Sequence, residues 1–259
     1  MTRLFYALLL SFSLLACNAE NEQPAQRQPL TAAQQQVQLN ALKLDFETPV
    51  RLDSSAYVMY PLLLDRKKDE EGDYFSSSSG DGGGLLFWNI SFYNTSTGEY
   101  HLLDDQRKML ISAYDLKEDN AHFRSSSSGL VSGGRVQAGI NEAEKLIFYT
   151  IRTTDFNHDG MLDGRDPAYL FVSDKTGRNF RQISPDSAHV DEWLALSHTS
   201  NVLLQINRDT NGDKKFDSKD EVTPMIYSTA TGAAAKDVFS PEFRVKTKQQ
   251  LNAQWPQAQ

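Results

Sequence analysis

Residues 145–183 read KLIFYTIRTTDFNHDGMLDGRDPAYLFVSDKTGRNFRQI, and residues 201–239 read NVLLQINRDTNGDKKFDSKDEVTPMIYSTATGAAAKDVF. Both stretches consist of a run of β-branched and aromatic residues, an acidic loop, a second such run, a Thr-Gly pair and a third run. Runs of this length and composition predict strands, and the glycine supplies the positive φ that a tight hairpin turn requires. The order strand, loop, strand, turn, strand thus occurs twice, with 55 residues between Gly177 and Gly232.

A third, less complete copy precedes these two. Its Thr-Gly turn is at Gly98, and the interval to Gly177 is lengthened by a serine- and glycine-rich stretch at residues 124–134. Further strands are expected at residues 57–64, 85–93 and 108–114, and no window of helical length holds an apolar stripe with a 3.6-residue period. We therefore predict an all-β protein built from repeated antiparallel sheets.

Repeats of this length, each a small antiparallel sheet, resemble β-propeller blades. The resemblance implies blades arranged around a common axis. Three units are recognisable here, whereas closed propellers have about four to eight blades. An open β-sandwich is therefore the alternative architecture.

The composition is that of an ordinary globular protein, with 259 residues of which 39% are hydrophobic and 23% charged. The formal net charge of −8 argues against nucleic-acid binding, because that function needs a basic surface. The single cysteine forms no intrachain disulfide and excludes a zinc site made of several thiolates. None of the five histidines shows the spacing of a zinc-hydrolase motif.

The single cysteine ends an N-terminal segment that reads MTRLFYALLLSFSLLAC. One arginine is followed by an apolar run at residues 4–15, which is typical of a secretory signal and too short for a membrane span. The closing Leu-Leu-Ala-Cys resembles the lipobox of bacterial lipoproteins. This resemblance implies that residues 1–16 are removed and that Cys17 carries acyl chains such as palmitate. Asn18, where aspartate often signals inner-membrane retention, favours the outer membrane over the inner one.

Composition changes along the rest of the chain predict three segments. Residues 17–44 are rich in glutamine and alanine and are expected to form a flexible tether that follows the lipidated cysteine. Residues 45–246 hold the predicted strands and form the β-repeat domain. Residues 247–259 are assigned to a C-terminal tail.

The acidic loops of the two repeats carry the clearest chemical signal. Residues 155–166 read DFNHDGMLDGRD and residues 209–220 read DTNGDKKFDSKD, and both match the D-x-[DN]-x-[DN] opening of a calcium-binding loop. Side-chain oxygens at positions 1, 3, 5, 9 and 12 and the carbonyl at position 7 are the expected ligands. These are Asp155, Asn157, Asp159, Met161, Asp163 and Asp166 in loop 1, and Asp209, Asn211, Asp213, Lys215, Asp217 and Asp220 in loop 2.

The loops resemble those of EF-hands and, with aspartate at position 12, those of dockerin modules. They differ from EF-hands in their flanks, which are predicted strands. At position 6 loop 1 has Gly160, whereas loop 2 has Lys214, and a left-handed conformation costs a non-glycine residue about 1 kcal/mol. We therefore expect two Ca²⁺ sites, the second weaker than the first.

These features together predict a lipid-anchored, calcium-binding protein of the bacterial cell envelope. It would face the periplasm and act in binding or scaffolding. Its partner would be an envelope protein or a glycan, and the acylated Cys17 would attach it to the membrane. The alternative is a hydrolase that uses a carboxylate pair on one face of a propeller. We favour a protein that is not an enzyme, because no nucleophile or acid–base motif stands out from the abundant Asp and Glu.

Overall fold

The computed structural model describes residues 31–53, 55–64, 85–115, 135–136, 145–196 and 199–255. The chain divides into two compact units, residues 1–43 and 44–259. In the first unit, helix α1 (Ala32–Ala41) begins at Thr31, whose side chain accepts the N–H of Gln34 while the Gln34 side chain accepts the N–H of Thr31. This reciprocal capping explains why a polar, fully exposed segment begins a helix there.

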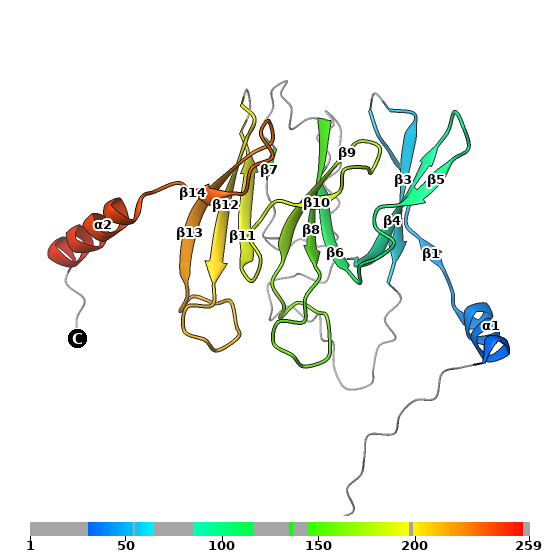
Figure 1. The fold of residues 1–259 in the computed structure, drawn as a ribbon, viewed down its shortest axis with the longest axis horizontal. Coiled ribbons are helices and arrows are strands. Elements are labelled where there is room, and N and C mark those ends of the chain that lie inside the picture. The colour runs from blue at the N-terminus through cyan, green and yellow to red at the C-terminus, as the bar shows by residue number, and fades with distance from the viewer. Residues whose placement is uncertain are drawn as a thin grey trace, which may run out of the picture. The chain divides into compact units, whose positions relative to one another are not determined.

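The second unit is all-β apart from one C-terminal helix (Figure 1). One sheet contains nine strands: β1 (Asp45–Phe46), β2 (Val50–Arg51), β3 (Tyr57–Leu63), β4 (Phe87–Asn94), β5 (Tyr100–Leu102), β6 (Leu110–Asp115), β8 (Leu146–Arg152), β9 (Tyr169–Asp174) and β10 (Arg181–Gln182). The other contains five: β7 (Arg135–Val136), β11 (His189–Ala195), β12 (Asn201–Arg208), β13 (Glu221–Ser228) and β14 (Lys236–Asp237).

The strands follow one another in three antiparallel meanders, β3-β4-β5, β6-β8-β9-β10 and β11-β12-β13-β14. The first two meanders form one sheet because β4 and β6 are joined by a single pair, Phe87 with Ile111. The prediction of repeated antiparallel sheets is confirmed. The closed arrangement of a propeller is not confirmed. Within the residues described, both sheets are open, and they form neither a barrel nor a complete ring.

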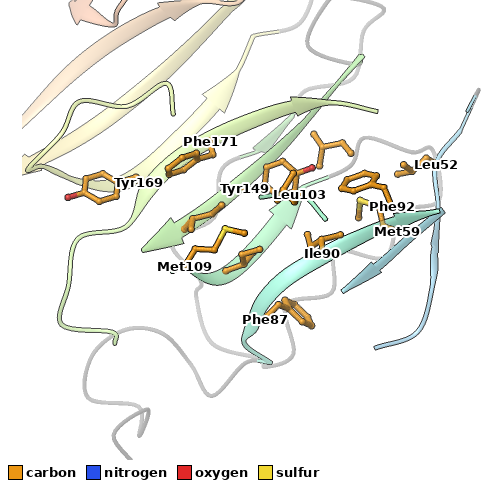
Figure 2. Packing of buried hydrophobic residues seen from close by; sticks show 13 residues of the cluster. Leu52, Met59, Phe87, Ile90, Phe92, Leu103, Met109, Tyr149, Tyr169 and Phe171 are labelled. Atoms are coloured by element: carbon orange, nitrogen blue, oxygen red, sulfur yellow. The ribbon is translucent and has the colours of Figure 1, made fainter. Parts of the chain in front are cut away.

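The middle meander is buried on both of its faces, which explains why its strands are almost continuously apolar. In β8, Ile147 and Tyr149 belong to one core cluster, which Figure 2 shows against β4, while Phe148 between them belongs to another. In β9, Phe171 belongs to the first cluster and Leu170 to the second. Alternate residues of a strand point to opposite faces, so this meander packs on a neighbour at each side.

The second core cluster joins the nine-stranded sheet to the five-stranded one. Phe148 of β8 stacks on Trp193 of β11, with ring centroids 4.6 Å apart. Val202 and Leu204 of β12 are buried in the same cluster. The two repeats that carry the acidic loops therefore pack face to face.

The three Thr-Gly turns form as predicted, with φ values of 78°, 76° and 65° at Gly98, Gly177 and Gly232. Gly177 has a second role, because a Cβ atom there would overlap the ring of Phe92, a buried residue of β4. The turn of the middle meander thus packs directly on the first meander. The other two turns have open space at this point.

Helix α2 (Pro241–Gln254) crosses the predicted boundary between the β-repeat domain and the C-terminal tail at residue 246. The side chain of Ser240 caps it by accepting the N–H of Phe243. It has no buried residue and contacts the β domain through charges: Arg244 pairs with Glu221, and Lys248 Nζ lies 3.2 Å from the same carboxylate. Such a helix escapes a search for apolar periodicity, because ion pairs and a cap hold it in place.

Candidate metal-binding loops

The structure places all twelve predicted ligand residues in two connections between strands. Loop 1 (residues 155–166) joins β8 to β9 in the nine-stranded sheet, and loop 2 (residues 209–220) joins β12 to β13 in the five-stranded sheet. Both loops project from the same end of the strands (Figure 1). The repeat found in the sequence therefore positions two copies of one loop next to each other.

The first half of loop 1 winds around its own side-chain oxygens. The carboxylate of Asp155 accepts the N–H groups of Asp159 (3.2 Å) and Gly160 (2.9 Å). The side-chain oxygen of Asn157 accepts the N–H of Asp159 at 2.9 Å, and the carboxylate of Asp159 accepts that of Met161 at 2.9 Å. Alternate residues thus turn their oxygens inward, because each accepts an N–H from farther along the loop.

Loop 2 repeats this pattern position for position. The carboxylate of Asp209 accepts the N–H groups of Asp213 (3.1 Å) and Lys214 (2.9 Å). The side chain of Asn211 accepts the N–H of Asp213 at 2.8 Å, and the carboxylate of Asp213 accepts the N–H of Lys215 at 3.0 Å. Because the two loops belong to different sheets, their own sequence determines the pattern.

Position 12 closes each loop by a second shared pattern. In loop 1 the two carboxylate oxygens of Asp166 accept the N–H groups of Phe156 (2.9 Å) and Asp163 (3.0 Å). In loop 2 the carboxylate of Asp220 likewise accepts the N–H groups of residues 210 (2.9 Å) and 217 (3.2 Å). One side chain therefore ties the beginning of each loop to its end.

The left-handed residues of the loops are distributed in a complementary way. Lys214 at position 6 of loop 2 has a φ of 61°, as its sequence position predicts, and Gly160 has a φ of 85°. Position 4 is left-handed as well, where loop 1 has His158 (φ 62°) and loop 2 has Gly212 (φ 77°). Each loop thus holds one glycine and one strained non-glycine residue. The loop motif specifies glycine at position 6 alone, so it gives no sign of the strain at His158.

The second half of loop 1 is buried. Asp163 and Asp166 are each 1% exposed, and the neighbouring Leu162 is 6% exposed. Nε of the buried Arg152 donates to the backbone carbonyl of Asp166 at 3.1 Å. Burial raises the pKa of Asp166 above its ordinary value. In loop 2 the corresponding carboxylate, Asp220, is half-buried, and the N–H of residue 210 lowers its pKa.

An arginine of loop 1 lies against two of the predicted ligands. Nη2 of Arg165 is 2.6 Å from the Asp159 carboxylate and 2.7 Å from the Asp163 carboxylate. The hydrogen bond to Asp163 raises the pKa of the guanidinium further. The positive charge of Arg165 therefore neutralises part of loop 1, a role that the loop motif does not predict because position 11 contributes no ligand.

The two loops contact each other through aromatic rings. Phe156 of loop 1 and Phe216 of loop 2 have ring centroids 5.1 Å apart, and His189 of β11 stacks on Phe216 at 5.7 Å. Nδ1 of His189 accepts the N–H of Ala168 at 2.9 Å. Burial, with a smaller contribution from Arg152, lowers the pKa of His189 to about 4, so the ring is neutral near pH 7.

The donor set of each loop suits a hard divalent cation in its chemistry, because carboxylate, amide and carbonyl oxygens are the ligands that calcium prefers. The side chains of this donor set are not arranged as a complete metal site. Throughout the part of the chain that the structure describes, no three or more His, Cys, Asp or Glu side chains converge as a metal-binding group. In loop 1 the space between Asp159 and Asp163 is bridged by Arg165.

Comparisons with known proteins give no family assignment. No protein-family model and no curated protein matches the chain. A solved structure of AtxE2 isopeptidase in its apo form aligns with 80% of this chain at 9% identity and a TM-score of 0.32. The chain spans 32% of the length of that isopeptidase.

The predicted signal peptide and Cys17 lie outside the described residues. Of the helices that are described, neither is long and apolar enough to cross a membrane.

Proposed function

We propose that the two loops bind one calcium ion each and that the protein is a lipid-anchored component of the bacterial envelope. The observation that carries the calcium proposal is the shared hydrogen-bond pattern of the loops. Two chain segments in separate sheets turn the oxygens of positions 1, 3 and 5 inward and close the turn with position 12. That spacing matches the oxygen ligands of a calcium-binding loop.

The hydrogen bonds within the loops leave oxygen lone pairs that can bind an ion. A carboxylate offers about four acceptor sites, so an oxygen that accepts one N–H retains a lone pair for a cation. Ion binding at loop 1 requires the Arg165 guanidinium to leave Asp159 and Asp163, since both carboxylates are proposed ligands. Extracytoplasmic calcium is often millimolar, and sites with dissociation constants of about 10⁻⁴–10⁻³ M would be occupied there.

The envelope location rests on the N-terminal sequence. The apolar run and Cys17 support a signal peptide and acylation, and Asn18 favours the outer membrane. Within this proposal the β domain is a propeller-like repeat, supported by three meanders that pack through two core clusters. Its role is to bind or scaffold an envelope protein or a glycan, with calcium stiffening the loop end of the domain.

Calorimetric titration of the purified protein with Ca²⁺ tests the metal proposal. We expect two equivalents for the wild type and one for each of the variants Asp155→Ala and Asp209→Ala, because position 1 holds the opening turn of each loop. Asp53→Ala, an exposed aspartate outside the loops, is the control and should retain both equivalents. Absence of binding heat at millimolar Ca²⁺, with melting temperatures unchanged by chelator, would contradict calcium binding.

The anchoring proposal has a separate test. Labelled palmitate should be incorporated into the wild-type protein in a bacterial host and should be absent from Cys17→Ser. Equal labelling of the two proteins would contradict acylation at this cysteine, whatever the outcome of the calcium titration.

A further inference from the structure

The aromatic contact between the loops is a direct path from one candidate ion site to the other. Phe156 occupies position 2 of loop 1, and Phe216 occupies position 8 of loop 2. Their rings lie 5.1 Å apart at an interplanar angle of 46°. The two residues are 60 positions apart and belong to different sheets, so chain connectivity does not impose the contact. Tertiary packing of the repeats creates it.

Each ring is attached to backbone that a proposed ligand holds. The N–H of Phe156 donates to Oδ1 of Asp166, the carboxylate at position 12 of loop 1. Phe216 directly precedes Asp217, whose N–H donates to Oδ2 of Asp220 at 3.2 Å. A change in either position-12 carboxylate therefore acts on the backbone that carries the ring of the same loop.

His189 provides a second connection between the loops. Its ring stacks on Phe216 at an interplanar angle of 29°, and its Nδ1 accepts the N–H of Ala168, two residues beyond Asp166. In the sheet, His189 pairs with Asn207 of β12, whose Nδ2 lies 3.4 Å from the carbonyl of Asp217. The imidazole is thus held by the end of loop 1 on one side and by loop 2 on the other.

We propose that calcium occupancy of the two loops is positively coupled and that Phe216, packed between Phe156 and His189, transmits the coupling. This inference rests on the proposed calcium binding. An ion fixes position 12 and, through it, the aromatic ring of that loop. The other loop then meets an already ordered partner, so less ordering remains for the second ion. Phe216 is a positioning residue here, because its side chain contributes no ligand.

The expected coupling is about 2- to 10-fold in affinity, the range that one aromatic pair supports. Titrations in 0.15 M KCl reduce the screening length to about 8 Å and so weaken repulsion between the two bound ions. Under these conditions the Ca²⁺ affinity of loop 2, measured in Asp155→Ala, should be about 2- to 10-fold lower than its affinity in the wild type with loop 1 saturated. Linkage requires the same factor for loop 1 when Asp209→Ala disables loop 2.

The same pair of measurements in a Phe216→Leu background isolates the aromatic path. The affinity ratio should fall to about 1, whereas Phe180→Leu, a ring that stacks on Phe171 away from the loops, should leave it unchanged. Phe156→Leu reaches the same contact from loop 1 and should also abolish the ratio, which guards against a local folding defect of Phe216→Leu. Amide resonances of Ala168 should shift when loop 2 of Asp155→Ala is filled.

The outcomes separate the two proposals. No binding to the wild type overturns calcium binding and the coupling with it. Two ions bound with affinities that do not depend on the other loop overturn the coupling alone. A ratio that persists in both Phe216→Leu and Phe156→Leu overturns the assignment of the aromatic path.

Discussion

The two repeats place the same twelve-residue loop in different surroundings. Both loops have one hydrogen-bond pattern, because it depends on Asp and Asn side chains accepting nearby N–H groups. Loop 1 is anchored by the buried Arg152 and holds carboxylates that are 1% exposed, whereas loop 2 is half-buried at most. Local sequence therefore determines how each loop turns, and neighbouring elements determine how firmly it is held.

Charge distinguishes the loops as well. Each loop has four aspartates, but loop 1 has one arginine and loop 2 has three lysines, so the formal charges are −3 and −1. A dication is therefore attracted more strongly to loop 1 at long range. At short range Arg165 weakens this preference for loop 1, because it pairs with two of the four carboxylates of loop 1. Each loop has one strained left-handed residue, His158 or Lys214, so strain does not make the second site weaker. The prediction of a weaker second site therefore depends on whether the more negative charge of loop 1 outweighs its pairing with Arg165.

The largest contrast between the repeats is expected at their Thr-Gly turns. Gly177→Ala should lower the free energy of unfolding by about 3 kcal/mol or more, because the new Cβ overlaps the Phe92 ring and the φ is left-handed. Gly232→Ala meets no atom within 4 Å and should cost about 1 kcal/mol. Urea unfolding measures both. Equal losses would show that the turn of the middle meander does not depend on its contact with Phe92.

Substitutions at position 12 should reveal that loop 1 is more deeply buried than loop 2. In the presence of chelator, Asp166→Ala should cost about 2–4 kcal/mol, because the buried N–H of Asp163 and the half-buried N–H of Phe156 lose their acceptor. Asp220→Ala should destabilise the protein much less, since water reaches the N–H groups of this half-buried to exposed loop and replaces the carboxylate there. Chemical denaturation with EDTA measures both without any contribution from metal. A larger loss for Asp220→Ala would reverse our ranking of the two loops.

The pH dependence of stability that His189 causes provides a test of the packing between the repeats. Its pKa falls from 6.5 in the unfolded chain to about 4 in the folded protein, so the unfolded state binds the proton more tightly. Stability from the neutral ring is fully present above pH 6.5 and is lost as the pH falls toward 4, by about 3 kcal/mol. His189→Gln should remove this part of the pH dependence. An unchanged pH profile in that variant would place the titration elsewhere.

The smallest expected effect is at the left-handed residues. His158→Gly and Lys214→Gly should each stabilise the protein by about 0.5–1 kcal/mol, because glycine adopts a positive φ without strain. Lys215→Gly, at a neighbouring position outside the left-handed region, should instead be neutral or destabilising. Thermal melting in chelator compares the three. A gain at Lys214 without one at His158 would restore the asymmetry that the sequence predicts at position 6.

The strands could be predicted from sequence because local apolar runs and Thr-Gly turns specify them. The run at residues 145–151, for example, becomes β8 (Leu146–Arg152), and residues 169–173 become β9 (Tyr169–Asp174). Helix α2 was missed because it depends on a Ser240 cap and on the ion pair of Arg244 with Glu221, and neither produces periodicity. The sequence also gives no sign of the start of β11 at His189, because its first residues alternate without an apolar run.

Some features of the candidate site could likewise be predicted from the sequence, and others could not. All twelve proposed ligands could be named from spacing alone, because ten of them are Asp or Asn side chains that accept hydrogen bonds within their own loop. The position of Arg165 across Asp159 and Asp163, and the strain at His158, follow from the loop conformation and are not part of the motif.

An antiparallel β protein with two equivalent acidic loops can be predicted from the sequence, since strand propensity, turn glycines and oxygen spacing act over a few residues. The folded structure was needed to show that the middle meander is buried on both faces, that loop 1 is anchored more deeply than loop 2, and that Phe156 contacts Phe216. These features arise from packing between segments that are 14 to 60 residues apart in the sequence, where no local pattern indicates which surfaces will meet.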